Sequence, residues 1–150
     1  MARDYALHFI YTVNFSFDLF KRKWRIIAHQ TQITGRHSEL LATTALVANG
    51  YEVAEPVVDE PYDLLIRKTD EETNWNRVQV KTCRVREDRG NSVVIYAKKN
   101  NGNPYTRADC DLLIGVEGEN VYIFPCEGHG EYWATESGVG EKWTKLKLKI

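Results

Sequence analysis

The chain has 150 residues, a mass of 17.3 kDa and a formal net charge of −1, a length that fits one domain. Its composition, with 43% hydrophobic and 27% charged residues, excludes a disordered tail protein. No apolar run is long enough to cross a bilayer and no secretory leader is recognisable, so we expect no membrane partner. The three cysteines, Cys83, Cys110 and Cys126, show no Cys-x-x-Cys spacing. They indicate neither a disulfide framework nor a cysteine zinc site, which favours a reducing, cytoplasmic compartment.

The small net charge hides a strong segregation of charge along the chain. Residues 50–76 carry two bases against eight acids, whereas residues 77–107 carry eight bases against two acids. A basic block attracts polyanions through its local field even when the average charge is near zero. The block therefore indicates nucleic acid as a candidate partner, and a solvated surface is the alternative.

The first elements predicted are aromatic and basic. Residues 5–15 are rich in aromatic and β-branched side chains and predict a strand or an extended arm. Asp18 can cap a helix over residues 19–27. Thr34 is the predicted N-cap of a second helix, which ends at Gly50 because glycine suits a left-handed C-terminal position. The predicted apolar stripe of this helix consists of Leu40, Leu41, Thr44, Ala45 and Ala48.

Strands dominate the rest of the chain. Short strands are expected at 62–67, 93–97, 112–116 and 121–124, and residues 75–84 alternate as in a strand. Residues 127–150 contain four glycines and are expected to be rich in loops, with a final strand within 142–150. One helix followed by strands with few helices between them predicts an α+β fold with a mixed or antiparallel sheet.

Two charged residues lie inside apolar strand sequences, where charge is costly unless it is paired or bound to a ligand. Asp63 lies within 62–66 and Lys81 lies within 78–82. Gln79 shares the strand face of Lys81, because side chains two apart point the same way. If the two strands are neighbours, these residues share one pocket, and Glu39 is a candidate fourth member. Such a set suits Mg²⁺, with the lysine orienting water or stabilising charge on phosphate. The alternative is an ion pair at a sheet edge.

The order of these motifs resembles the PD-(D/E)XK nuclease superfamily, and within it the group I intron-associated homing endonucleases. The resemblance rests on Glu39 in a helix, Gly50-Tyr-Glu-Val53, Pro61-Tyr-Asp63 and Arg77-Val-Gln-Val-Lys-Thr82, and continues through the Tyr105 to Asp111 run to residues 121–125. It implies a restriction-endonuclease-like core, a central mixed β-sheet flanked by helices. The resemblance covers about residues 35–126, the expected catalytic core. We expect one nuclease domain over 1–150, in which the aromatic residues 1–34 form an N-terminal arm or interface extension and residues 127–150 form the loop-rich tail.

The resemblance also implies roles for individual residues. Asp63 matches the metal-binding aspartate, Lys81 the catalytic lysine and Glu39 the helix glutamate of many members. Two departures stand out: Tyr62 separates Pro61 from Asp63, and Gln79 occupies the position of the usual acid. The side-chain carbonyl of Gln79 and the backbone carbonyl of Val80 are both candidate ligands of Mg²⁺, and Glu39 can supply the missing charge.

The function implied is that of a Mg²⁺-dependent, site-specific double-strand DNA endonuclease of the homing type. The resemblance implies that water attacks the phosphodiester in line and leaves 5′-phosphate and 3′-hydroxyl ends. One chain carries one site, so a homodimer or tetramer is expected. The residues predicted to contact DNA are Arg84, Arg86, Arg89, Lys98, Lys99, Asn100, Asn101, Asn103 and Arg107. The alternatives are a structure-selective Holliday junction resolvase and, because of Gln79, a non-catalytic DNA-binding module on a decayed nuclease fold.

Overall fold

The structure is a computed structural model that describes residues 29–69 and 73–150. The strand or arm predicted at 5–15 and the helix predicted at 19–27 lie outside these residues. The chain divides into two compact units, 1–33 and 34–150, and every described strand belongs to the second unit. Within the described ranges, no helix is long and apolar enough to cross a membrane.

Helix α2 spans Gln30–Ala48, so it begins four residues before the predicted N-cap at Thr34, and that prediction is wrong. The reason is local: the backbone carbonyl of His29 already accepts hydrogen bonds from the N–H groups of Gln32 and Ile33. The end of the helix agrees with the sequence. Gly50 has a φ of +79°, the left-handed conformation that a residue with a β-carbon rarely adopts.

The buried face of α2 is built from small residues. Ser38, Ala42, Ala45 and Leu46 are buried, whereas Leu40, expected in the apolar stripe, is 51% exposed and Thr44 is exposed as well. Small side chains allow a helix backbone to lie close to a sheet, and this close approach selects the alanine face over the leucine face. The predicted stripe is therefore corrected at Leu40 and Thr44.

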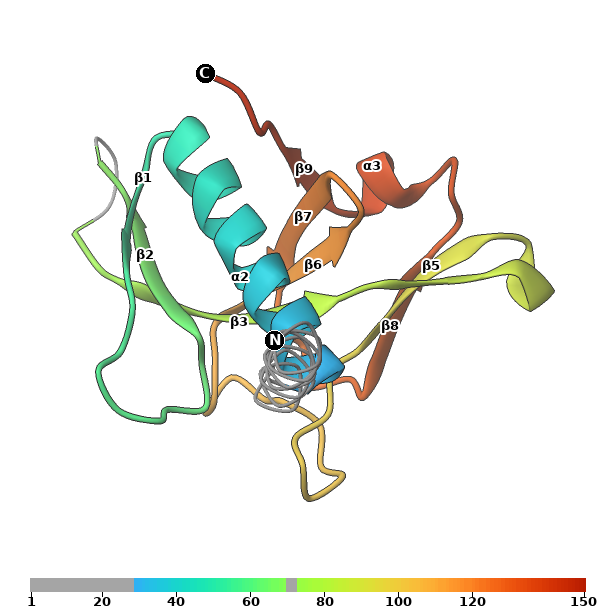
Figure 1. Cartoon of the computed structure of the whole chain (residues 1–150), viewed down its shortest axis with the longest axis horizontal. Coiled ribbons are helices and arrows are strands. Elements are labelled where there is room, and N and C mark those ends of the chain that lie inside the picture. Colours follow the sequence, from blue (N-terminus) through green and yellow to red (C-terminus); the bar gives the residue numbers. More distant parts are fainter. Residues whose placement is uncertain (1–28, 70–72) are drawn as a thin grey trace, which may run out of the picture. The chain divides into compact units, whose positions relative to one another are not determined.

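The central sheet has six strands in the order β1-β2-β3-β6-β7-β9 (Figure 1). Their bounds are β1 (Tyr51–Ala54), β2 (Leu64–Lys68), β3 (Asn76–Thr82), β6 (Leu112–Glu117), β7 (Asn120–Pro125) and β9 (Thr144–Leu146). Strand β3 runs parallel to β6, and the other neighbours pair antiparallel. The prediction of a mixed sheet in an α+β fold is confirmed.

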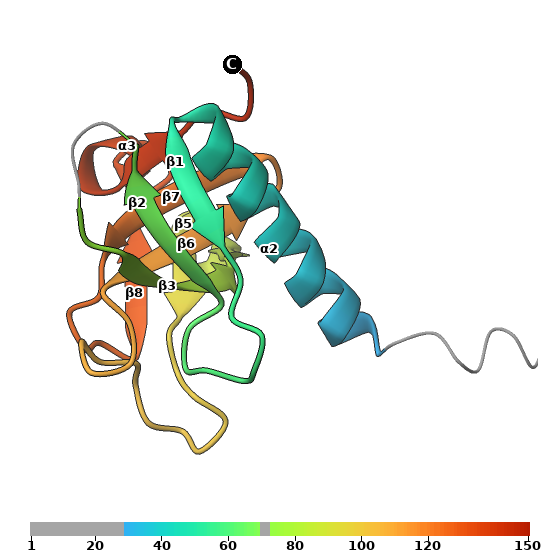
Figure 2. The same ribbon diagram turned by 90° about the vertical axis from the view of Figure 1, so that its left-hand side faces the viewer.

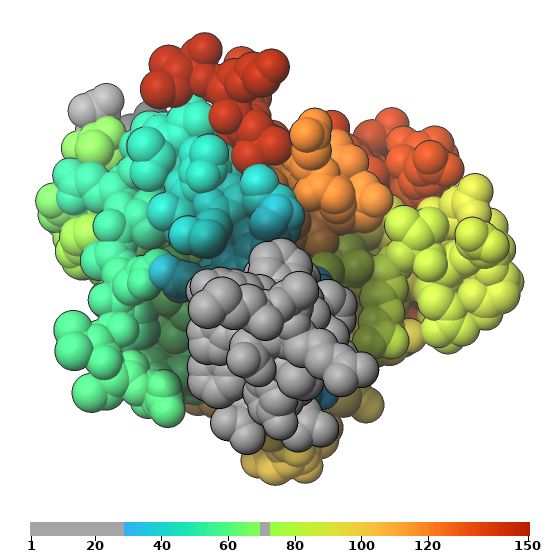
Figure 3. Space-filling model, in the orientation of Figure 1, coloured from blue at the N-terminus to red at the C-terminus, as the bar shows by residue number. Residues whose placement is uncertain are grey.

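A second sheet of three antiparallel strands has the order β4-β5-β8, with β4 (Arg84–Arg86), β5 (Ser92–Tyr96) and β8 (Glu131–Ala134). Strands β4 and β5 form a hairpin closed by the 3₁₀ turn η1 (Glu87–Arg89). This hairpin forms a lobe at one end of the surface (Figure 3). Residues 127–150, expected to be rich in loops, also supply β8, the short helix α3 (Val139–Lys142) and β9.

The central sheet carries one hydrophobic core on each face. Val78 and Val80 of β3 pack with α2, whereas Leu113 of β6 and Phe124 of β7 pack with the three-stranded sheet. The second unit is therefore layered as helix, six-stranded sheet and three-stranded sheet (Figure 2). The face of β3 that carries Gln79 and Lys81 looks toward the second core, because side chains alternate along a strand.

One glycine sets the distance between the two sheets beside Lys81. Gly115 is the register partner of Lys81 in the parallel β3–β6 pair. A β-carbon at Gly115 would collide with Ile95 of β5 and lie 2.8 Å from Sγ of Cys83. The missing side chain lets the second sheet pack directly against the strand pair that carries the lysine.

Candidate active site

Asp63 is fixed against β3 at the start of β2. Its backbone N–H donates to the carbonyl of Val78 at 2.8 Å. Its Oδ2 accepts hydrogen bonds from the Gln79 amide nitrogen at 2.6 Å and from the Val80 backbone N–H at 2.7 Å. The structure thus brings Asp63, Gln79 and Val80, three of the residues predicted for the site, into direct contact.

Lys81 projects from the same face of β3 as Gln79 and is half-buried. Its Nζ lies 3.4 Å from the hydroxyl of Tyr105 and 4.7 Å from the centre of the Tyr105 ring. Burial lowers the pKa of the Lys81 ammonium, against the opposing attraction of Asp63 and other nearby groups. No salt bridge joins Lys81 to an acid within the described part of the chain, so the ion pair at a sheet edge considered from the sequence is not what the structure shows.

Glu39 reaches the site from α2. The preceding residue, Ser38, is 3% exposed and its hydroxyl lies 2.7 Å from that of Thr82 at the end of β3, which fixes this turn of the helix to the sheet. Glu39 accepts a hydrogen bond from Arg36 at 2.9 Å. Glu39 and Asp63 line one cleft of about 190 Å³ together with carboxylates of the β1–β2 connection, Glu55, Asp59 and Glu60.

The electrostatics of Asp63 follow from this surrounding. Burial raises the pKa of the Asp63 carboxyl, and the charge of Glu39 raises it further. The Val80 N–H, the Lys81 charge and the Gln79 amide act in the opposite direction. Asp63 is therefore a half-buried carboxylate held in direct contact only by neutral donors, a state that a bound cation would relieve.

The donor set fits a hard cation in its chemistry. Asp63 and Glu39 offer carboxylates, and Gln79 and Val80 offer carbonyl oxygens, which are the ligand types that Mg²⁺ prefers. The Gln79 amide donates to Asp63 and to the Val80 carbonyl, and its own carbonyl oxygen accepts no hydrogen bond from the described residues. Within the described ranges, no three His, Cys, Asp or Glu side chains lie close enough to form a metal cluster by themselves. A cation bound by these residues would therefore need carbonyl oxygens as well as acids as ligands.

The predicted DNA-contacting residues lie on two separate segments. Arg84, Arg86 and Arg89 belong to the β4–β5 hairpin, whereas Lys98 to Arg107 form the loop after β5. The loop turns tightly, with Lys99 N–H donating to the Asn103 carbonyl at 2.8 Å and Gly102 at a φ of +84°. It projects from the same end of the unit as the β1–β2 connection that lines the acidic cleft (Figures 1 and 2).

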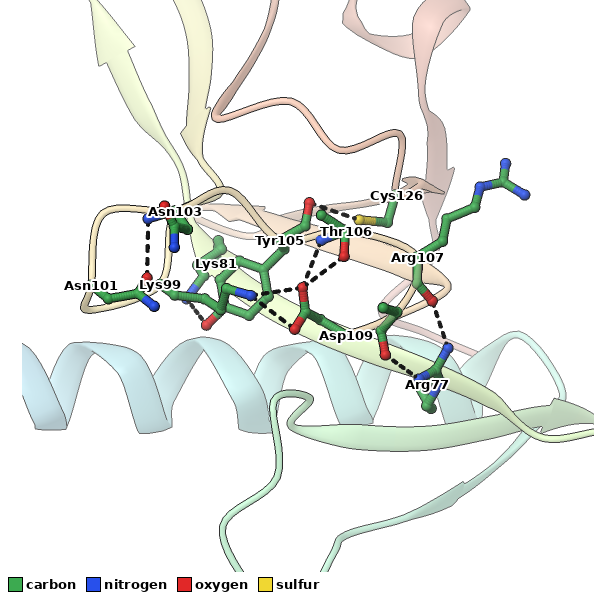
Figure 4. A network of polar contacts seen from close by, with 11 residues as sticks. Arg77, Lys81, Lys99, Asn101, Asn103, Tyr105, Thr106, Arg107, Asp109 and Cys126 are labelled. Atoms are coloured by element: carbon green, nitrogen blue, oxygen red, sulfur yellow. Dashed lines mark hydrogen bonds and ion pairs between the residues drawn. The ribbon is translucent and has the colours of Figure 1, made fainter.

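Three of the six predicted cations have acidic partners. Arg86 pairs with Asp88, Arg89 with Glu131, and Lys99 with Asp109. Arg84 lies over the Tyr96 ring at 5.5 Å, while Lys98 and Arg107 are exposed. The Arg107 side chain points away from the polar network around it (Figure 4). Of the three asparagines, Asn101 caps the turn by accepting from the Asn103 N–H at 3.0 Å.

Two residues near the site were not assigned roles from the sequence. Arg77 binds both carboxylate oxygens of Asp111 and the backbone carbonyls of Arg107 and Ala108, which ties the loop to β3 (Figure 4). Tyr105 lies under Lys81. Both stand in the sequence runs that carry the family resemblance, but their contacts cross 24 to 34 residues of chain, and no local pattern reveals them.

The three cysteines are free and buried. Burial raises the pKa of the Cys83 thiol to about 12 and raises that of Cys110 as well. A raised pKa keeps the thiols of Cys83 and Cys110 protonated and makes them poor nucleophiles, so both act as small apolar side chains of the core.

Comparison with known proteins gives a consistent result. The family model described as PD-(D/E)XK endonuclease matches residues 29–139. Among solved structures, a bacterial homing endonuclease, I-Ssp6803I, is similar with a TM-score of 0.56 and 25% sequence identity. The similarity covers 73% of this chain and 78% of that one. The search of curated proteins finds no match.

Proposed function

We propose, from the premise that the chain belongs to the PD-(D/E)XK endonuclease family, that it is a Mg²⁺-dependent, site-specific endonuclease of the homing type that cuts both strands of DNA. Membership in the family makes it a nuclease, and endonucleases of this family use a divalent metal ion. The metal identity, the target type and the oligomeric state are the parts we propose.

The proposal is carried by one arrangement. Asp63 and Gln79 are in hydrogen-bond contact across β2 and β3, Lys81 follows on the same strand face, and Glu39 shares a cleft with Asp63. A half-buried carboxylate, a carbonyl oxygen, a lysine and a second acid form a set that suits metal-assisted hydrolysis of a phosphodiester. An ordinary surface ion pair would not leave the acid and the lysine without each other as partners.

The residues divide the work as follows. Asp63 and Glu39, with the carbonyl of Gln79 or Val80, would hold Mg²⁺, which supplies positive charge to the phosphate under attack. Lys81 places its ammonium where it can orient the attacking water or stabilise charge that develops on the phosphate oxygens. Gln79 and the Val80 N–H hold the Asp63 carboxylate in one orientation, so the ligand is placed before the substrate arrives.

The basic segments supply the DNA contacts in this proposal. Arg84, Lys98 and Arg107 have no acidic partner within the described residues and remain available for phosphates. Arg86, Arg89 and Lys99 would need to exchange their carboxylate partners for phosphate, which lowers the net gain. Asn100, Asn101 and Asn103 on the projecting loop carry the amide groups that pair with base edges. One chain has one site, so cutting two strands calls for a homodimer or a tetramer.

The experiment that tests the proposal compares two DNA substrates, linear genomic DNA and a synthetic four-way junction, with Mg²⁺ and with EDTA. Wild type, Asp63→Ala and the control Glu119→Gln, an exposed acid on the β6–β7 turn, are assayed side by side. The proposal expects a few discrete Mg²⁺-dependent cuts in linear DNA that Asp63→Ala abolishes and Glu119→Gln keeps.

Two other outcomes would contradict the proposal in different ways. Cleavage of the junction alone would identify a structure-selective resolvase. Tight binding of DNA with no cleavage under any divalent metal would identify a non-catalytic module in which Gln79 marks the lost acid.

A further inference from the structure

The ammonium of Lys81 has an unusual partner for a lysine in a strand. Its only polar contact within the described residues is the hydroxyl of Tyr105 at 3.4 Å, and the ring centre of the same tyrosine lies 4.7 Å away. A tyrosine ring attracts a cation through its negative face, and the attraction is stronger where water is partly excluded. One aromatic side chain thus contacts the amine through both its face and its hydroxyl.

Tyr105 is itself held rigidly. It is 9% exposed and belongs to the core between the two sheets. Its N–H donates to the Ala97 carbonyl at 3.0 Å, and its own carbonyl accepts from the Cys126 thiol at 3.5 Å. A side chain fixed by its backbone on both sides can hold a flexible neighbour in place.

The residues that follow Tyr105 form a second anchor. Asp109 accepts from the N–H and hydroxyl of Thr106 at 2.9 and 3.0 Å, and the ammonium of Lys99 binds both its carboxylate oxygens at 2.9 Å. Figure 4 shows this network beside the Lys81–Tyr105 contact. Asp109 therefore joins the start of the loop to the segment directly after Tyr105.

We propose that Tyr105 is a positioning residue that fixes the ammonium of Lys81 in the orientation required for cleavage. This inference rests on the proposed nuclease function and deepens it. A lysine side chain has four rotatable bonds, and an unpaired one samples many rotamers, so restraint of Nζ raises the fraction of molecules ready to react. Tyr105 does not touch the substrate in this arrangement and acts through Lys81.

The position of Tyr105 in the chain gives the restraint a second consequence. Tyr105 lies in the same loop as Lys98, Asn103 and Arg107, which are predicted to contact DNA. Tyr105 therefore joins the segment that meets the target to the residue that acts on the phosphate.

The test uses the full-length protein and the DNA that the wild type cuts. Cleavage rate constants are measured in single turnover with enzyme in excess, and DNA affinity is measured in EDTA. Tyr105→Leu is expected to slow cleavage about tenfold or more, and Tyr105→Phe, which keeps the ring, is expected to stay within about threefold of wild type. DNA affinity should change by less than about twofold in both variants.

Tyr132→Leu is the matched control. Tyr132 is 7% exposed and belongs to the same core as Tyr105, but among the described residues it makes no contact with Lys81. Its truncation creates a comparable cavity and should leave the rate constant per folded molecule unchanged. An equal loss of rate in Tyr132→Leu and Tyr105→Leu would overturn the proposal, because core damage would then explain both.

A spectroscopic readout separates positioning from activity. In protein with ¹³C-labelled lysine, the ε-CH₂ protons of Lys81, assigned by their loss in Lys81→Met, should be shifted upfield by the Tyr105 ring. The shift should persist in Tyr105→Phe and vanish in Tyr105→Leu. An unshifted resonance in wild type, or full cleavage in Tyr105→Leu, would overturn the role of Tyr105 alone. Failure of the wild type to cut any DNA would instead overturn the proposed function.

Discussion

Strand β3 carries two cations four residues apart on one face, and their surroundings differ. Arg77 is paired with Asp111 through two side-chain hydrogen bonds at 2.9 and 3.1 Å, and it also binds the carbonyls of Arg107 and Ala108. Lys81 has no acidic partner in the described part of the chain and contacts a tyrosine. Arg77 is nearly saturated with acceptors, whereas Lys81 keeps donors free.

This difference separates a structural charge from a functional one. A cation whose hydrogen bonds are filled by the protein contributes to stability and has little left for a ligand. A half-buried cation with unfilled hydrogen-bond donors lowers the stability of the folded protein. Such an unfavourable group is typical of a binding site, where a ligand supplies the missing acceptors. On this reasoning Arg77 stabilises the loop 106–111, whereas Lys81 keeps the free donors that its role in the proposed function requires.

The substitution Lys81→Met tests the functional role of Lys81 most directly, because it keeps the length of the side chain and removes the charge. Cleavage should fall at least about 10³-fold, because the ammonium acts on the reacting groups. DNA affinity should stay near that of wild type, and the melting temperature should stay the same or rise, because a half-buried charge is removed. A clear drop in melting temperature would show instead that Lys81 is structural in the same way as Arg77.

Arg77→Met tests the other half of the comparison. It removes the side-chain donors of the half-buried Asp111 carboxylate and of two carbonyls, while the backbone N–H of residue 77 still donates to Asp111 at 2.8 Å. The free energy of unfolding in urea should fall by about 2 kcal/mol. Arg67→Met is the matched control, because Arg67 of β2 forms a surface pair at 2.7 Å with Glu52 of the edge strand β1. This substitution should cost less than about 1 kcal/mol. An equal cost for both variants would contradict the structural role of Arg77.

The same distinction between filled and free cations applies within the loop after β5. Arg107→Ala should weaken DNA binding and reduce the slope of affinity against salt concentration by about one counterion. Lys99→Ala should change the slope less and lower the melting temperature instead, because Lys99 is paired with Asp109. Fluorescence anisotropy at several salt concentrations measures both slopes of DNA affinity against salt. A larger change of slope for Lys99→Ala than for Arg107→Ala would show that Lys99, not Arg107, contacts the phosphates.

Glu39→Gln tests how the charge of Glu39 affects the neighbouring acid, Asp63. Glu39 raises the pKa of Asp63, so its neutralisation should lower that pKa, as measured by NMR titration of the Asp63 carboxyl carbon. A raised pKa in the folded state means that stability of the metal-free protein is lost as pH rises through that pKa. The loss should be smaller in Glu39→Gln. Glu55→Gln, a change in the same cleft, should leave the Asp63 pKa in place.

Much of the fold follows from local pattern. Alternation of side chains over 76–82 predicts strand β3 and the shared face of Gln79 and Lys81, and both are observed. Gly50 predicts the end of α2 correctly. The start of α2 and its buried face do not follow, because they depend on how closely the helix approaches the sheet, which is a tertiary property.

The contact between Asp63 and Gln79 could be predicted from the sequence, because charged residues in apolar segments single out Asp63 and Lys81 and because the segments pair. The structure places Asp63 directly before β2. Tyr105 gives no such signal, because a tyrosine beside a proline in a polar loop has nothing unusual in its local sequence. Its importance arises only when residues 24 positions apart meet in space.

The parallel pairing of β3 with β6 has a consequence for how such a protein can change over time. Two parallel neighbours cannot be joined by a short turn, so residues 83–111 must leave the central sheet and return to it. The ends of this excursion are fixed by the ladder, by Gly115 and by Arg77, whereas its tip at 100–102 is exposed and bears no part of the core. Insertion or exchange of residues at this tip should therefore leave the packing of β3 against β6 unchanged. Under the proposed function, such changes would alter the DNA target and leave the strand that carries Lys81 in place.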